Sequence, residues 1–99
     1  MRLSERQREQ IRQIVGEEAG SEAIVKLFGS RLDDHAKGSD VDLMGEIDSA
    51  VQHPAELAAR LSSRISRALH GRKVDVLISA ANLSHLPIHD IAREQGIAL

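Results

Sequence analysis

Leucine or isoleucine recurs at every fourth position in the segment that follows His53-Pro54. The four residues are Leu57, Leu61, Ile65 and Leu69. This spacing is typical of an α-helix that buries one face and exposes the other. Pro54 suits the first turn of such a helix, and Gly71 is placed to end it. The segment is therefore predicted to be a helix, with the arginines at positions 60, 64 and 67 on a solvated face where they could also meet an acidic partner.

Three shorter segments have the features of β-strands. They are Ala23–Phe28, Asp40–Ile47 and Lys73–Ile78. The first is a run of apolar residues cut off by a glycine, whereas the other two alternate apolar and polar positions. The alternation in the third predicts Val74, Val76 and Ile78 on one face, and Asp75 and Leu77 on the other.

Two further helices are predicted, one over Ser4–Glu18 capped by Ser4, and one over Pro87–Glu94 capped by Asn82 or Ser84. The resulting order is helix, strand, strand, helix, strand, helix, without repeats or a linker. It predicts a single domain of residues 1–99 in the α+β class, with a small mixed β-sheet and helices packed mainly on one face.

The composition of the 99 residues excludes several classes of function. Thirteen Lys and Arg against fifteen Asp and Glu give a net charge of −2, which argues against a duplex-binding footprint. The single aromatic residue rules out a stacking platform for single-stranded nucleic acid, and the lack of cysteine rules out disulfides and thiolate zinc sites. The N-terminal segment is polar, and no apolar run approaches the ~20 residues of a membrane span. We therefore expect a cytoplasmic domain that contacts neither a membrane nor nucleic acid directly.

Three aspartates are candidates for the chemistry of the chain. Asp40 and Asp42 lie two residues apart on a predicted strand, so their side chains share a face with Cα atoms ~6.6 Å apart. Asp75 lies on another predicted strand and reaches the same place if the two strands are neighbours. Oxygen ligands of this kind favour Mg²⁺ held together with substrate phosphates. One or two such ions would assist an in-line phosphoryl displacement.

A glycine–serine turn precedes these acids and offers an anion site. Gly29 allows the backbone to approach a phosphate, Ser30 adds a hydroxyl donor, and Arg31 can bridge phosphate oxygens. Taken singly, each feature also fits a plainer interpretation, with the acids on the wet face of an edge strand and Gly29-Ser30 in an ordinary turn. Their combination on three strands favours a site.

Two histidines near the C-terminus have the spacing of metal ligands on a helix. His85 and His89 lie four residues apart, but Pro87 lies between them and no third ligand is visible. Both are therefore predicted to be solvated residues at the start of a helix.

The sequence FGSR, a nine-residue spacer after Ser30, DVDL and a later VDVL together resemble the motifs of the nucleotidyltransferase superfamily of DNA polymerase β. The form most similar to this chain is the minimal nucleotidyltransferase that pairs with HEPN-domain toxins in prokaryotic toxin–antitoxin operons. The resemblance covers nearly the whole chain. One departure is that the chain has no tyrosine near its C-terminus, where relatives often have one, and this leaves the base preference open.

The resemblance implies roles for individual residues. The implied nucleotide-binding residues are Gly29, Ser30, Arg31 and Ser39. The implied metal ligands and catalytic residues are Asp40, Asp42 and Asp75. In this scheme Asp75 takes the proton of the acceptor hydroxyl or helps the metal to lower the pKa of that hydroxyl. One or two Mg²⁺ ions are bound, and ATP is the co-substrate. The implied acceptor is a hydroxyl of a HEPN-domain partner protein.

The resemblance, taken together with these patterns, implies two functions from different classes. The first is an adenylylating enzyme that acts as an antitoxin, and the alternative is a non-catalytic antitoxin that neutralises its partner by binding alone. A regulatory nucleic-acid binder fits the net charge and the single aromatic residue poorly. The complete set of three aspartates favours the enzyme, because clustered carboxylates without a metal repel one another. The acceptor residue, the number of metals and the oligomeric state, a homo-oligomer included, stay open.

Overall fold

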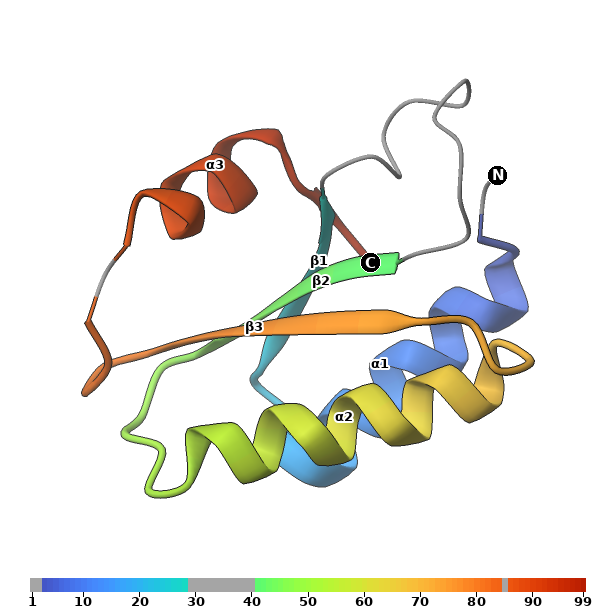
Figure 1. Ribbon diagram of the computed structural model, residues 1–99, viewed down its shortest axis with the longest axis horizontal. Coiled ribbons are helices and arrows are strands. Elements are labelled where there is room, and N and C mark those ends of the chain that lie inside the picture. Colours follow the sequence, from blue (N-terminus) through green and yellow to red (C-terminus); the bar gives the residue numbers. More distant parts are fainter. Residues whose placement is uncertain (1–2, 29–40, 85) are drawn as a thin grey trace.

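The computed structural model describes residues 3–28, 41–84 and 86–99. Within these residues the chain forms three helices and a four-stranded sheet (Figure 1). The elements are α1 (Glu5–Ala19), β1 (Ile24–Phe28), β2 (Val41–Ile47), α2 (Pro54–Ala68), β3 (Val74–Ala80), α3 (Pro87–Gln95) and β4 (Ile97–Ala98). The predicted α+β class and the predicted order of its elements are confirmed.

The strand order β3-β2-β1-β4 gives a mixed sheet. β1 pairs antiparallel with β2 and with β4, whereas β2 and β3 run parallel and are joined by α2. A parallel pair needs such a crossover, because the chain must return to the end of the sheet from which the first strand started. β2 and β3 therefore begin at the same end of the sheet, next to the turn that links α2 to β3 (Figure 1).

The helices lie on both faces of the sheet, with α1 and α2 on one face and α3 on the other (Figure 1). The larger core lies under α1 and α2 and takes alternate strand residues such as Val41 and Leu43, both fully buried. A smaller cluster joins Phe28, Met44 and Ala92 beneath α3. Two of the three described helices thus share a face, as predicted.

The helices begin and end largely as their sequences predict. Ser4 caps α1, since its hydroxyl accepts from Gln7 N while the Gln7 side chain accepts from Ser4 N. The four-residue apolar stripe of α2 is at most 5% exposed. The predicted cap of α3 is wrong, because α3 begins after Leu86 and Asn82 instead exchanges two hydrogen bonds of 2.9 Å with the backbone of Val51. β4 is missing from the prediction because a strand of two residues has no readable alternation.

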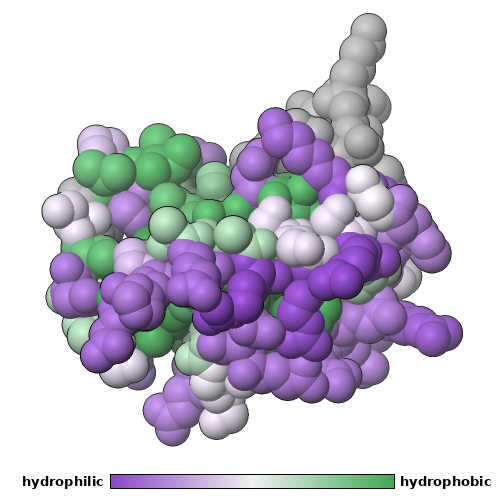
Figure 2. Space-filling view, turned by 60° about the horizontal axis from the view of Figure 1, so that its bottom comes forward, coloured by the Kyte–Doolittle hydropathy of each residue, from purple (hydrophilic) through white to green (hydrophobic). Residues whose placement is uncertain are grey.

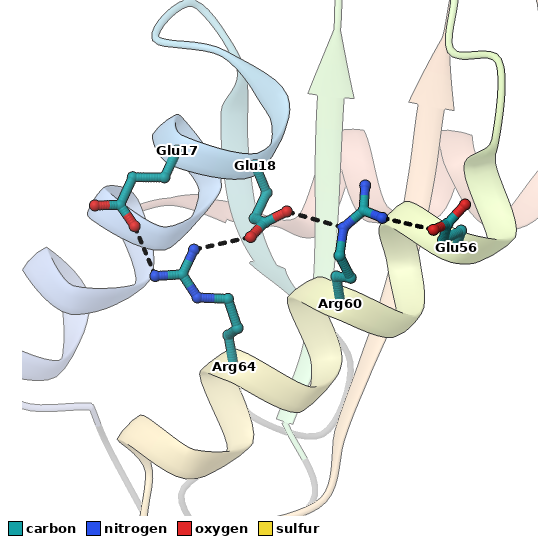
Figure 3. A network of polar contacts seen from close by, with 5 residues as sticks. All are labelled: Glu17, Glu18, Glu56, Arg60 and Arg64. Atoms are coloured by element: carbon teal, nitrogen blue, oxygen red, sulfur yellow. Dashed lines mark hydrogen bonds and ion pairs between the residues drawn. The ribbon is translucent and has the colours of Figure 1, made fainter.

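Arginines of α2 bind glutamates of α1, and this network fixes the two helices to each other (Figure 3). Arg64 contacts Glu17 at 2.6 Å and Glu18 at 2.9 Å, and Arg60 contacts Glu18 and Glu56 at 2.9 Å each. These arginines are partly exposed, and their acidic partners lie within the chain. The hydrogen bonds from Arg64 lower the pKa of Glu17 and of Glu18, and the same bonds raise the pKa of Arg64.

Hydrophilic residues cover the outer side of α1 and α2, as Figure 2 shows. None of the helices in the described part of the chain has the length and apolar character that crossing a bilayer requires.

We expect the network of Figure 3 to make stability depend on pH in the acidic range. A carboxylate whose pKa is lowered on folding adds stability above its unfolded pKa of about 4.3, and this stability is lost as the pH falls through the lowered folded pKa. Urea unfolding at pH 7 and at pH 3 should show lower stability at pH 3. Arg64→Met should show a smaller loss than the wild type, because the Arg64 bonds, which are the largest cause of both lowered pKa values, are absent.

Arg67→Met is the matched control for this prediction, since Arg67 is exposed on the same helix. An acid-induced loss of equal size in both variants would contradict the assignment of the pH dependence to Arg64.

Candidate functional site

Three residues form a row across one end of the sheet. Asp42 on β2 pairs in register with Phe28 on β1 and with Asp75 on β3. Neighbouring strands lie about 4.8 Å apart, and residues in register point to the same side of the sheet. The strand of Asp75 is thus the neighbour of the strand of Asp42, which is the condition that the sequence-based site requires.

The row lies on the face of the sheet opposite α1 and α2. Val41 and Leu43, on either side of Asp42, are fully buried in the larger core, so the Asp42 side chain points to the other face. On β3, Val74 is buried in the same core, and the next residue, Asp75, is exposed. The two carboxylates share a face, as the alternation in both strands predicts.

A hollow of about 440 Å³ opens at this row. Its lining residues are Phe28, Asp42, Asp75, Val76, Leu77 and Ile88. Four of the six are apolar, so the two carboxylates stand against a largely apolar wall, to which α3 contributes Ile88. The volume lies within the range of about 300–1,000 Å³ that is usual for small-molecule sites.

The turn that follows α2 fixes the first residues of β2 and β3. Val41 N donates a hydrogen bond to Lys73 O at 2.9 Å, and the Ser66 hydroxyl donates to Arg72 O at 2.6 Å. The hydroxyl of Ser62 on α2 donates to the carbonyl of the first residue of β3. These bonds lie directly beside the acidic pair, so the backbone spacing of the two carboxylates is held by hydrogen bonds as well as by packing.

His89 attaches α3, and with it Ile88, to β3. His89 is 4% exposed, its Nδ1 accepts a hydrogen bond from Leu86 N at 2.9 Å, and its Nε2 lies 3.1 Å from Ile78 O. A ring that accepts at Nδ1 carries its proton on Nε2, which donates to the Ile78 carbonyl. The prediction that His89 is solvated is wrong, because its ring takes the capping-box position usually held by Glu or Gln. His85 lies outside the described residues.

Asp42 and Asp75 are the two predicted site residues within the described part of the chain. The other predicted site residues lie outside it, namely Gly29, Ser30, Arg31, Ser39 and Asp40. In sequence, Gly29 directly follows the last residue of β1, and Asp40 directly precedes the first residue of β2. Residues 3–28, 41–84 and 86–99 contain no group of three His, Cys, Asp or Glu placed to hold a metal ion, and the third predicted ligand, Asp40, is not among them.

The donors of Asp42 and Asp75 fit a hard divalent cation. Both are carboxylates on neighbouring strands, and the hollow is lined by no sulfur or imidazole donor among the described residues. Mg²⁺ in enzymes is usually bound through one or two carboxylates, with its other ligands supplied by water and substrate phosphates. The carboxylate pair matches the protein ligation that Mg²⁺ usually has.

The apolar wall of the hollow was not identified from the sequence as part of a site. The signal for Leu77 is the alternation that puts it on the face of Asp75, and Phe28 is the only aromatic residue and directly precedes Gly29. Ile88 has no such signal, because its position depends on how α3 packs against the sheet.

Comparison of the sequence with models of known protein families finds no match, and comparison with curated proteins finds none either. Support for a function therefore comes from the site and from its sequence motifs.

Proposed function

We propose that this chain is a Mg²⁺-dependent minimal nucleotidyltransferase of the polymerase β-like kind, which moves AMP from ATP to a hydroxyl of a partner protein. The observation that carries the proposal is the pairing of Asp42 with Asp75, in register on two parallel strands. Metal-dependent phosphoryl transfer needs carboxylates that converge in this way. The resemblance of the sequence to the antitoxins of HEPN-domain toxins supports this reaction and a HEPN-domain protein as the partner.

The proposed reaction is an in-line displacement at the α-phosphorus of ATP. The acceptor oxygen forms a bond to that phosphorus, the P–O bond toward the β-phosphate breaks, and pyrophosphate leaves. The carboxylate of Asp75 takes the proton of the acceptor hydroxyl. Asp42 and Asp75, with Asp40, would hold Mg²⁺, which when bound offsets the negative charge of the phosphate oxygens.

The apolar wall contributes to the same reaction. Phe28 and Leu77 stand beside the carboxylates, and Ile88 faces them from α3. Apolar side chains at these positions keep bulk water from part of the site, and charges interact more strongly where water screens them less.

A second candidate is neutralisation of the partner by binding alone. It is favoured by the exposed apolar side chains at α3, since Leu86, Ile88 and Ile91 are 52%, 45% and 47% exposed. Exposed apolar groups that lie together are typical of protein contact surfaces. The two candidates share a partner and differ in whether a nucleotide is transferred.

Labelled nucleotides separate these candidates. The chain is incubated with Mg²⁺, its co-expressed HEPN-domain partner and each of the four nucleoside triphosphates labelled at the α-phosphate. We expect ATP to label a Tyr, Ser or Thr of the partner, mass spectrometry to find the nucleotide adduct, and EDTA to prevent it. If the partner is fully inhibited in a stable complex, yet unmodified with all four nucleotides, the chain neutralises it by binding alone and the proposed reaction is wrong.

Thermal unfolding tests the nucleotide site without the partner. A ligand at about 100 times its Kd adds about 2.7 kcal/mol to the free energy of unfolding, which is a rise in Tm of roughly 10–20 °C for a domain of this size. We expect this rise with Mg²⁺ and ATP together and a much smaller one with either alone. An unchanged Tm at millimolar Mg²⁺ and nucleotide, with all four bases, would argue against the site.

A further inference from the structure

The turn between α2 and β3 gathers basic side chains. They are Arg67, His70, Arg72 and Lys73, and the segment 67–73 is called the basic connector below. Arg67, His70 and Lys73 are exposed, and Arg72 is partly exposed. Within the part of the chain that the structure describes, none of the four forms an ion pair, whereas Arg60 and Arg64 earlier in α2 each contact two glutamates. The positive charge of the basic connector is therefore available to a partner.

The basic connector has a fixed backbone. Gly71 N donates to Ser66 O at 2.8 Å, and the Ser66 hydroxyl donates to Arg72 O at 2.6 Å. His70 and Gly71 have φ values of +62° and +84°, which is the left-handed conformation that ends many helices. A surface whose backbone is already ordered loses less conformational entropy when it binds.

The strand order places the basic connector on one side of the acidic pair. β3 is an edge strand, and the connector leads directly into it, with Lys73 two residues before Asp75. β1 lies on the other side of β2, and it ends at Phe28. In the proposed function the residues that follow β1 bind the nucleotide phosphates, so the side of β3 is left for the acceptor.

We infer that the basic connector is a docking surface for an acidic patch on the protein that presents the acceptor hydroxyl. Positive charges beside the site would steer such a partner and fix its orientation. That the docked protein carries the acceptor hydroxyl rests on the proposed function. The charge and the ordered backbone of the connector are independent of that function.

An acidic protein surface fits the basic connector better than a nucleic acid does. The one aromatic side chain, Phe28, is 9% exposed and so offers little surface for base stacking. Asp42 and Asp75 next to the connector would repel a continuous row of phosphates. A protein can instead place carboxylates over the connector and a neutral hydroxyl over the acidic pair.

Two fluorescent probes test this surface, a peptide of about twenty glutamates and an oligouridylate of about twenty nucleotides. Their binding is measured by fluorescence anisotropy at low salt, without Mg²⁺ or nucleotide, because screening by salt weakens exposed charge contacts. The connector variant is Arg67→Gln/Lys73→Gln. The matched control is Arg60→Gln/Arg93→Gln, at exposed arginines of α2 and α3, which changes the net charge equally. We expect the connector variant to bind the peptide about tenfold more weakly and the control less than about twofold more weakly.

Equal weakening in the two variants, with both shown to be folded by thermal unfolding, would overturn the docking surface. Tighter binding of the oligouridylate than of the peptide, with the same dependence on Arg67 and Lys73, would overturn it in favour of an RNA surface. The measurement involves no nucleotide transfer, so its result is separate from that of the proposed reaction. If the protein binds the peptide through the connector but transfers no nucleotide, the docking surface is supported and the proposed reaction is contradicted.

Discussion

If the proposed function holds, replacing Asp42 with asparagine is expected to reduce nucleotide transfer to the partner by at least about 100-fold, because it removes a charged group from the proposed Mg²⁺ site. The substitution keeps the size of the side chain, which points away from the larger core. The midpoint of urea unfolding should therefore change little. The rate of label transfer and the unfolding midpoint, measured on the same preparation, check both halves of this expectation.

Asp48→Asn is the matched control, since Asp48 is an exposed aspartate just after the other end of β2. It should transfer nucleotide at the wild-type rate, and Asp75→Asn should lose transfer as Asp42→Asn does. Normal transfer by Asp42→Asn would show that this carboxylate is not a metal ligand.

Replacing Leu61 with alanine is expected to destabilise the protein by about 2–5 kcal/mol, a large part of the about 5–15 kcal/mol that holds a domain of this size folded. Leu61 is 1% exposed, in the middle of the apolar stripe of α2. Its removal leaves a cavity between α2 and the sheet that the surrounding side chains fill only in part. Thermal unfolding should show a Tm lower by more than about 10 °C.

Ser63→Ala, two residues further along α2 and exposed, is the control for this prediction. It should change the free energy of unfolding by no more than about 0.5 kcal/mol. Similar losses in both variants would mean that α2 is not held by its buried stripe.

Local patterns were enough to predict most of the fold. The period of the apolar residues in α2 and the alternation around Asp75 are short-range signals, and both are read correctly from the sequence. The same alternation predicts that Asp42 and Asp75 each point away from a buried face. The sequence does not show that their two strands are neighbours, because strand pairing joins segments far apart in the chain. The predicted site therefore depended on this pairing as a condition.

The parts that the sequence did not predict depend on packing between remote segments. The sequence of α3 shows that His89 lies near a helix start, but its second partner, Ile78 O, comes from β3. Arg64 binds glutamates more than forty positions away, so only the folded chain shows that it is paired, whereas Arg67 has no ion pair within the described residues. For the same reason, only the folded chain shows that Ile88 belongs to the wall of the hollow.

Both carboxylates of the site belong to one continuous stretch, residues 41–80, in which α2 connects the two parallel strands. α3 and β4 are attached to the outside of this stretch, through the other face of the sheet and through β1. Proteins open locally in cooperative units, and peripheral units open at a lower free energy than the whole molecule does. Transient release of α3 would therefore change the wall around the carboxylates, to which α3 contributes Ile88, while the register of the two strands stays intact. The part of the wall that α3 contributes can therefore open at a lower free energy than the pair of strands that holds the acids.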